Sequence, residues 1–263
     1  MTGTVEREWE FARLERDGHR ADVVITRAEK RNAMNEGVLR DLTAAVEAAA
    51  DLDGVRAMVL VGEGPVFSAG MDLRMMRDRP DEGASRELFP ELLGTIEGVR
   101  VPTVAAIKRA GPAGAFELSL PFDFRILGSE ARYGVIEVKL GTFPHGGATQ
   151  RLPRLIGLSK AKELVLTGEF IDPEEAAACG LVHDVVPDPR VDARAREFAD
   201  DLCANAPLGM TRAKRALDAA LETDLEEGLG LERKLAAEIE DSHDYAEGFE
   251  AHLEGREPEF EGR

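Results

Sequence analysis

The sequence predicts an α/β fold. Short apolar runs typical of buried strands alternate, in the first part of the chain, with segments whose apolar residues recur at helical spacing. From about residue 147 the pattern becomes mostly helical. A chain of 263 residues with 43% hydrophobic residues can also bury a sizeable core without disulfide bonds or a structural metal. These observations indicate an α/β core followed by a helical C-terminal part.

The alternation begins near the N-terminus. RADVVITR (20–27) and RAMVLVGE (56–63) are apolar runs that predict short buried strands. Between them, GVLRDLTAAVEAAADL (37–52) has the apolar period of an amphipathic helix. TVAAIK (103–108) and FRILG (124–128) predict further strands.

A helix is expected between these last two strands, over AGAFELSL (113–120). It belongs to the apolar run AGPAGAFELSLPF (110–122), whose only carboxylate is Glu117. A buried glutamate without partners is costly, and it responds by raising its pKa or by finding hydrogen-bond donors. The alternative is a helix whose one polar side chain faces water.

From about residue 147 the sequence contains several helical segments. We place a boundary near 195–205, which separates an α/β core over 1–200 from a helical region over 201–263. The segments are ATQRLPRLIG, LSKAKELVLTG, PEEAAACG, VDARAREFADDLCANAP and the long stretch 209–238.

The chain is strongly acidic, with 51 acidic against 33 basic residues and a formal net charge of −18. Such a surface repels nucleic acids and anionic membranes, so neither is expected as a partner. Because the acids are spread along the whole chain, we hypothesise a salt-tolerant surface suited to the high-salt cytosol of a halophile. No apolar leader and no run of 18 apolar residues is present, which predicts a cytoplasmic protein.

Several common sites do not match the sequence. Cys179 and Cys203 fit neither a disulfide framework nor a metal spacing, so no metal is expected. GEGPVFSAG (62–70) follows a strand, but a dinucleotide motif needs glycine at Phe67, and no P-loop lysine follows. A nucleophile elbow needs glycine two residues before Ser68, which is therefore interpreted as a turn or capping residue.

Two junctions, VLVGEGPVFSAGMDL (59–73) and AAIKRAGPAGAFEL (105–118), share one pattern. Each passes from a buried strand through small residues into an expected helix. Helix N-termini leave backbone N–H groups unpaired, so two of them at one spot would stabilise a developing oxyanion. The alternative is that glycine and alanine only allow tight turns here.

Six segments in order cover nearly the whole chain: ITRAEKRNAMN (25–35), VLVGEGPVFSAGMDL (59–73), the run 110–120, YGVIEVKLGTFPHGGATQRLPRLIG (133–157), LTGEFIDPEEAAACGLVHDVV (166–186) and EGFEAHLEGREPEFEGR (247–263). Together they resemble the crotonase, or enoyl-CoA hydratase/isomerase, superfamily. The resemblance implies a crotonase-like spiral of ββα units with a C-terminal helical trimerisation region, assembled as a homotrimer or a dimer of trimers. It also implies chemistry on acyl-CoA thioesters.

The resemblance assigns roles to four residues. The backbone N–H groups of Met71 and Gly114 would hold the thioester carbonyl and stabilise an enolate-like intermediate. Glu117 would be the general base that activates water for attack at Cβ, and Glu137, in YGVIEVKLG, would supply the proton to Cα. Without the family, Glu137 is interpreted as an exposed charge at a strand end.

The chain departs from the family pattern at two places. Ala113 and Ala115 flank Gly114 where hydratases usually have a glycine triplet, so added methyl groups lie near the carbonyl pocket. His145 stands where typical hydratases have glycine and dienoyl-CoA isomerases have a catalytic aspartate. We interpret His145 either as an auxiliary group in proton transfer or as a pocket-lining residue.

The resemblance also points to the binding of coenzyme A, which enters as part of the substrate, so no separate cofactor is expected. The segment 76–99 is expected to form a wall over the acyl chain or to contribute core or subunit contacts. The residues expected to bind coenzyme A are Asn32, Ala33, Ala69, Met71 and Arg74.

The function expected from these residues is that of an enoyl-CoA hydratase, a hydro-lyase of fatty-acid β-oxidation or a related acyl-CoA degradation route. A double-bond isomerase is the enzymatic alternative, because it needs a shuttling base but no bound water. A non-catalytic subunit that binds acyl-CoA or serves assembly is the alternative from another class, and the two acids argue against it.

Overall fold

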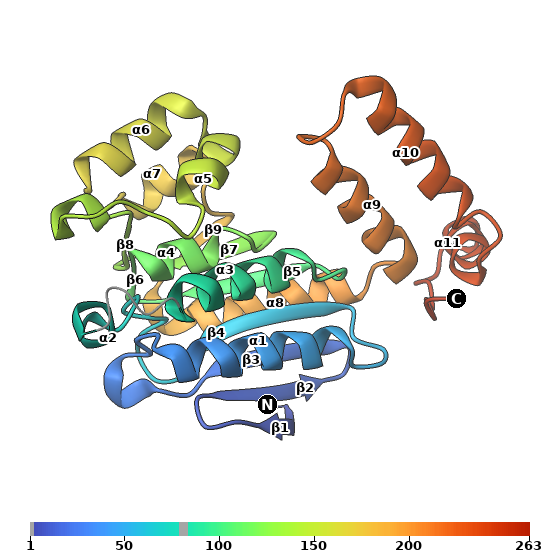
Figure 1. The fold of residues 1–263 in the computed structure, drawn as a ribbon. Coiled ribbons are helices and arrows are strands. Elements are labelled where there is room, and N and C mark those ends of the chain that lie inside the picture. The colour runs from blue at the N-terminus through green and yellow to red at the C-terminus, as the bar shows by residue number, and fades with distance from the viewer. Residues whose placement is uncertain (1–2, 79–83) are drawn as a thin grey trace.

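A sheet covered by helices on both faces dominates the computed structural model, which describes residues 3–78 and 84–263 (Figure 1). Within these residues, seven strands join in the order β1-β2-β3-β4-β5-β7-β9. The first three strands pair antiparallel, and those from β3 onward pair parallel. The strands are β1 (Thr4–Glu8), β2 (Ala12–Asp17), β3 (Arg20–Ile25), β4 (Ala57–Gly62), β5 (Thr103–Ile107), β7 (Phe124–Gly128) and β9 (Asp184–Val186).

The two faces of the sheet pack against different helices. On one face lie α1 (Glu36–Ala50) and α3 (Ala84–Glu97), and on the other lies α8 (Val191–Cys203). Side chains of β4 alternate between them: Met58 and Leu60 join the core with α1, whereas the valines between and after them join the core with α8. Burial on both faces explains why this strand is a continuous apolar run.

A second, two-stranded parallel sheet positions the candidate site. It pairs β6 (Ala110–Pro112) with β8 (Arg132–Gly134). Helix α4 (Gly114–Ser119) begins directly after β6, and the 3₁₀ helix η2 (Glu137–Leu140) follows β8. A backbone hydrogen bond of 2.9 Å from Ala113 to Gly134 continues the pairing. The start of α4 and the segment leading into η2 are thereby held side by side.

Two further groups of helices flank the sheet (Figure 1). One consists of α5 (Ala148–Ile156), α6 (Leu158–Thr167) and α7 (Pro173–Ala178). The other, which we call the C-terminal arm, consists of α9 (Pro207–Ala219), α10 (Leu225–Ala237) and α11 (His243–Glu254). Lys214 of the arm donates to Asp123 beside β7 at 2.5 Å. The remaining elements are η1 (Ala28–Lys30), α2 (Leu73–Asp78) and η3 (Asp188–Arg190).

The predicted α/β fold class is confirmed, as are the strands expected within the first 130 residues and the helices expected between them. Strands β1, β2 and β9 and the small second sheet were not expected. The division at residue 200 stays a prediction; that position lies within α8, which runs to Cys203 and packs on the sheet. The segment 76–99 contains the end of α2 and all of α3, while residues 79–83 lie outside the described residues.

Candidate active site

Glu117 lies in α4, a short helix in which every residue is buried. Its Oε1 accepts hydrogen bonds from the backbone N–H groups of Gly146 (2.8 Å) and Ala148 (3.1 Å). Burial raises the pKa of Glu117, whereas these two N–H groups and the charges of His145 and Arg151 lower it. Glu117 is therefore a buried acid with donors on one of its two oxygens.

Glu137, the first residue of η2, is 5% exposed, so the interpretation as an exposed charge is wrong. Both of its carboxylate oxygens are buried, and neither has a hydrogen-bond partner among the described residues. Burial raises the pKa of Glu137 to about 7, and the negative charge of Glu117 adds to the increase. The two acids thus interact, although β7 and β8 separate them in the chain.

The backbone nitrogens of Met71 and Gly114 lie close together where the two junctions meet. A Cβ added to Gly114 would lie 3.5 Å from the nitrogen of Met71, and one added to Gly70 would lie 3.7 Å from the nitrogen of Gly114. Gly70 has φ +88°, a conformation that favours glycine. Neither nitrogen donates a hydrogen bond to another described residue. Two unpaired donors from separate junctions are therefore available to one oxygen that gains charge.

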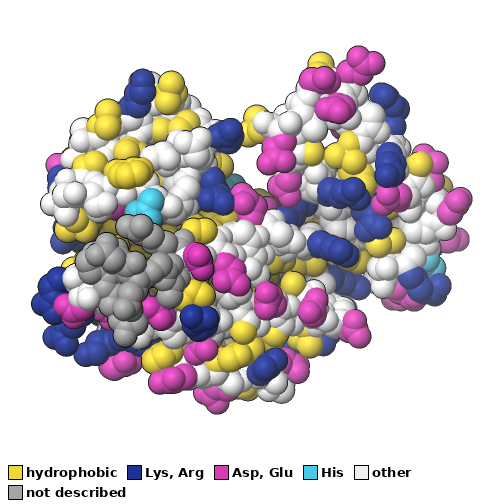
Figure 2. All heavy atoms as spheres, in the orientation of Figure 1, with side chains coloured by type: hydrophobic (Ala, Val, Ile, Leu, Met, Phe, Trp, Pro, Cys, Tyr) yellow, Lys and Arg dark blue, Asp and Glu magenta, His cyan; other side chains and the backbone are white. Residues whose placement is uncertain are grey.

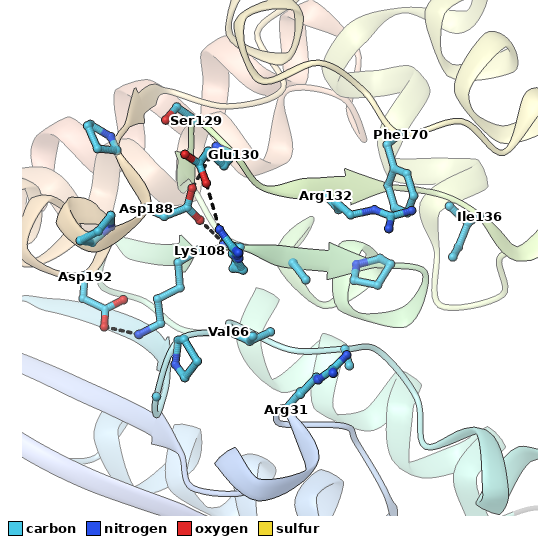
Figure 3. Close-up of a pocket in the computed structure, with 18 residues that line it drawn as sticks. Arg31, Val66, Lys108, Ser129, Glu130, Arg132, Ile136, Phe170, Asp188 and Asp192 are labelled. Atoms are coloured by element: carbon cyan, nitrogen blue, oxygen red, sulfur yellow. Dashed lines mark hydrogen bonds and ion pairs between the residues drawn. The ribbon is translucent and has the colours of Figure 1, made fainter.

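Two pockets lie beside this junction, and Ala69 lines both. The larger has a volume of about 1290 Å³ and includes Pro112 and Ile136, the residue before Glu137 (Figure 3). The smaller has a volume of about 700 Å³. Of the residues expected to bind coenzyme A, Ala33, Ala69, Met71 and Arg74 line the smaller pocket.

Some charged side chains of the larger pocket form ion pairs with described residues, and others do not. Lys108 forms an ion pair with Asp192 at one end of the pocket (Figure 3). Arg31 forms no ion pair with another described residue, and Arg132 lies 4.4 Å from the ring centre of Phe170. Arg31 and Arg132 reach the pocket from opposite sides in Figure 3. The pocket therefore presents two cations that no described carboxylate neutralises.

The side chain of Asn32 holds a turn that lines the larger pocket. It is completely buried, and its Oδ1 accepts from the backbone of Arg27 at 3.1 Å. Its Nδ2 donates to the carbonyls of Glu63 and Val66 at 3.0 and 2.8 Å. These side-chain bonds fix the glycine-rich turn, and a contact of Asn32 with coenzyme A stays a prediction. Ser68 donates to the carbonyl of Asn32 at 2.7 Å, as expected of a turn residue.

A search against known families gives a match over residues 18–263, to the family described as enoyl-CoA hydratase/isomerase. The chain belongs to this enoyl-CoA hydratase/isomerase family. A 2,3-dehydroadipyl-CoA hydratase of Escherichia coli is 34% identical over 92% of this chain and 94% of its own. The mitochondrial methylglutaconyl-CoA hydratase of Mus musculus is 36% identical over 90% of this chain and 78% of its own.

Solved structures of the family have the same fold. An enoyl-CoA hydratase from Bacillus anthracis superimposes with a TM-score of 0.92 at 31% identity, covering 97% of this chain and 100% of that one. The crotonase fold is thereby confirmed, with its sheets followed by C-terminal helices. Membership of the family implies an acyl-CoA substrate. None of the described helices is both long and apolar enough to cross a membrane.

The loop before α5, which holds Glu117, was not expected from the sequence. The two N–H donors come from HGGATQR, where paired glycines precede α5, and a helix start whose first N–H groups lack helical partners was a usable signal. His145 is exposed on this loop, and its Nδ1 lies 3.2 Å from the carbonyl of Phe143. Its charge acts on Glu117. A part for His145 in proton transfer stays a prediction.

Proposed function

We propose that the protein is an enoyl-CoA hydratase, which adds water reversibly to a trans-2-enoyl-CoA and gives a 3-hydroxyacyl-CoA. The observation that carries the proposal is the pair of buried acids. Glu117 has its Oε1 fixed by two N–H groups, and Glu137 has no partner among the described residues on either oxygen and a pKa raised to about 7. Two acids with such different surroundings suit a base and an acid acting in one reaction.

The reaction assigns one proton transfer to each acid. Ionised Glu117 takes a proton from water, whose oxygen forms the bond to Cβ. Neutral Glu137 gives its proton to Cα, so the pair returns to the same total charge with the proton on the other carboxyl group. Because burial favours the neutral form of Glu137, this acid can hold its proton up to a pH of about 7.

The thioester oxygen gains negative charge as water adds. We place it between the N–H groups of Met71 and Gly114, which have no other described partner. Fixed donors of this kind are each worth about 10²–10³ in rate. The coenzyme A portion would then extend past Ala69 and Arg74, and its phosphates would reach Arg31, which has no ion pair with a described residue.

The test measures hydration of crotonyl-CoA by the Glu117→Gln and Glu137→Gln variants. The reaction is monitored by the loss of the enoyl thioester absorbance. Each variant should lose about 10²–10⁴ in turnover and remain folded, because the amide has nearly the same shape but cannot exchange the proton. Glu91→Gln, which changes an exposed acid on α3, is the matched control and should keep normal turnover. Near-normal hydration by either active-site variant would refute the assignment.

The same assay separates the other activities and narrows the substrate. A hydratase leaves a 3-enoyl-CoA unconverted, whereas a double-bond isomerase moves its double bond. Absence of both reactions, together with binding of acyl-CoA, would indicate a non-catalytic subunit. Because two relatives are named for 2,3-dehydroadipyl-CoA and methylglutaconyl-CoA, these thioesters belong in the screen beside crotonyl-CoA.

We also propose that the C-terminal arm assembles the protein into a homotrimer or a dimer of trimers. The arm extends away from the sheet in Figure 1 and exposes large apolar side chains. Such side chains are the usual material of subunit contacts. Light scattering in molar salt would measure the mass, and a monomer would contradict the proposal. The large apolar side chains that the arm exposes are Leu217, Leu221, Leu225, Phe249 and Leu253.

A further inference from the structure

Arg151, on α5, links the loop that precedes this helix to α3. Its Nη1 donates to the carbonyl of Gly146 at 3.2 Å, while its Nε and Nη2 donate to the carboxylate of Glu97 at 3.1 and 2.8 Å. Gly147, with φ +100°, lies against the guanidinium, since a Cβ there would collide with Nη1. Glu97 is the last residue of α3. The planar fork of arginine thus holds two elements in one fixed geometry.

Gly146 is held from both sides. Its N–H donates to Oε1 of Glu117, and its carbonyl accepts from Arg151. A Cβ on Gly146 would collide with Phe89 of α3 and would lie 2.8 Å from Oε2 of Glu117. The loop is therefore in close contact with both the acid and the helix. Any shift of the loop moves the bond that fixes Oε1 and so redirects Oε2.

Three charged or titratable side chains act on Glu117, each from a different segment. They are His145 on the loop, Arg151 on α5 and Glu137 on η2. His145 is exposed, and Glu137 is the second acid of the reaction. Arg151 is partly buried, and the guanidinium of an arginine keeps its charge in proteins. Among these three it is the permanent counter-charge.

We propose that Arg151 is a positioning residue for Glu117: it fixes the loop whose N–H groups hold Oε1, and its charge favours the carboxylate. This inference rests on the proposed function, in which Glu117 is the general base. Arg151 itself touches neither the water nor the thioester in this proposal. Its removal should therefore alter the pH at which Glu117 works as well as the rate.

The first test is the pH profile of kcat/KM on crotonyl-CoA for Arg151→Gln. Without the cation, Glu117 is protonated more readily, so the acid limb should move up by about one pH unit, and kcat should fall about tenfold with KM little changed. Arg154→Gln is the matched control, because Arg154 is exposed on the same helix and, among the described residues, donates only to the carbonyl of Gln150. An unchanged acid limb in Arg151→Gln would overturn the proposal.

Two further variants keep the test decisive if Arg151→Gln does not fold. Arg151→Lys keeps the charge but loses the fork, so its acid limb should stay near that of the wild type while kcat falls. Glu97→Gln should lower kcat about threefold in the wild type and have no further effect in Arg151→Lys, because Glu97 acts through the fork. Fully additive losses would contradict this linkage.

Failure of the proposed function can be told apart from failure of this inference. If the wild type hydrates no enoyl-CoA, the hydratase assignment falls, and the inference is then tested without turnover. Carbon-13 NMR of carboxyl-labelled glutamate, with Glu117 assigned through Glu117→Gln, reports its titration directly. Arg151→Gln should shift that titration to higher pH, and an unshifted curve would overturn the positioning role.

Discussion

At the level of single residues, one amino-acid type has contrasting surroundings at Glu117 and Glu137. The sequence marked Glu117, because a lone acid in an apolar run needs either partners or water. Nothing local marked Glu137 as buried, since YGVIEVKLG mixes polar and apolar residues. Its burial arises from the pairing of β6 with β8, a contact between distant segments. The role of Glu137 could therefore come only from family resemblance, and its environment only from the fold.

Replacing Glu137 with glutamine should stabilise the protein above a pH of about 7. Its pKa is raised from an ordinary 4.5 to about 7, so the folded state keeps a proton that the unfolded state releases between these values. The wild type consequently loses stability as pH rises from about 4.5 through about 7, and no further above it, whereas glutamine cannot ionise. The difference is at most about 3 kcal/mol.

Urea unfolding of the wild type and Glu137→Gln at about pH 5 and about pH 8 would measure this effect. The two proteins should be similar at the lower pH, and the variant should be more stable at the higher pH. Glu130→Gln, which changes an exposed acid, controls for the loss of a surface charge. The same pH dependence in all three proteins would show that ionised Glu137 carries no folding penalty.

Arg31→Gln should weaken the binding of coenzyme A esters while sparing the chemistry. If the unpaired Arg31 meets a phosphate, removal of that charge-assisted contact should raise KM about tenfold. The corresponding pantetheine ester lacks the nucleotide, so its KM should not change. Arg40→Gln, on the exposed side of α1, is the control. An equal rise in KM for both esters would place the nucleotide elsewhere.

At the level of elements, strands with apolar side chains on both faces were predictable and the others were not. β3 and β4 are buried throughout; β4 is a continuous apolar run, and β3 is apolar except for Arg20 and Asp22, which form an ion pair with each other. β1, with the sequence TVERE, is exposed at every position and has no apolar pattern. β9 has only three residues and is defined by pairing with β7. These elements depend on partners that local sequence does not specify.

The start of α4 contains a strained residue that the sequence also marked. Ala113, one of the departures from the family's glycine triplet, has φ 50° and ψ −121°, a conformation that disfavours any side chain. Ala113→Gly should therefore stabilise the protein by about 1 kcal/mol. Ala115→Gly is the matched control, since Ala115 lies within α4 and the same change should destabilise by about 1 kcal/mol. Urea unfolding that shows a loss for both variants would contradict strain at Ala113.

At the level of the whole molecule, the sequence predicted the fold class through alternation, and the family through its ordered segments. It did not predict how the C-terminal arm lies relative to the sheet, because that depends on a few contacts between distant residues, such as Lys214 with Asp123. Surface charge is a second property of the whole molecule. Acidic side chains are scattered over the face shown in Figure 2, including the arm, rather than gathered in one patch. Such a distribution affects stability and association more than recognition of one ligand.

The dispersed net charge of −18 leads us to expect greater stability in molar potassium chloride. Salt screens the repulsion among excess acids, and it also weakens the surface ion pairs. Repulsion should dominate, because exposed pairs contribute only about 0–1 kcal/mol each while the excess charge acts over the whole surface. Since the screening length falls from about 10 Å at 0.1 M to about 3 Å at 1 M, the gain from screening should level off near molar salt.

Urea unfolding across a series of potassium chloride concentrations would record this curve, with sucrose as a control for solute exclusion without screening. Equal stability in dilute buffer would contradict a surface adapted to high salt, and a gain that continues linearly beyond 1 M would point to solute exclusion instead.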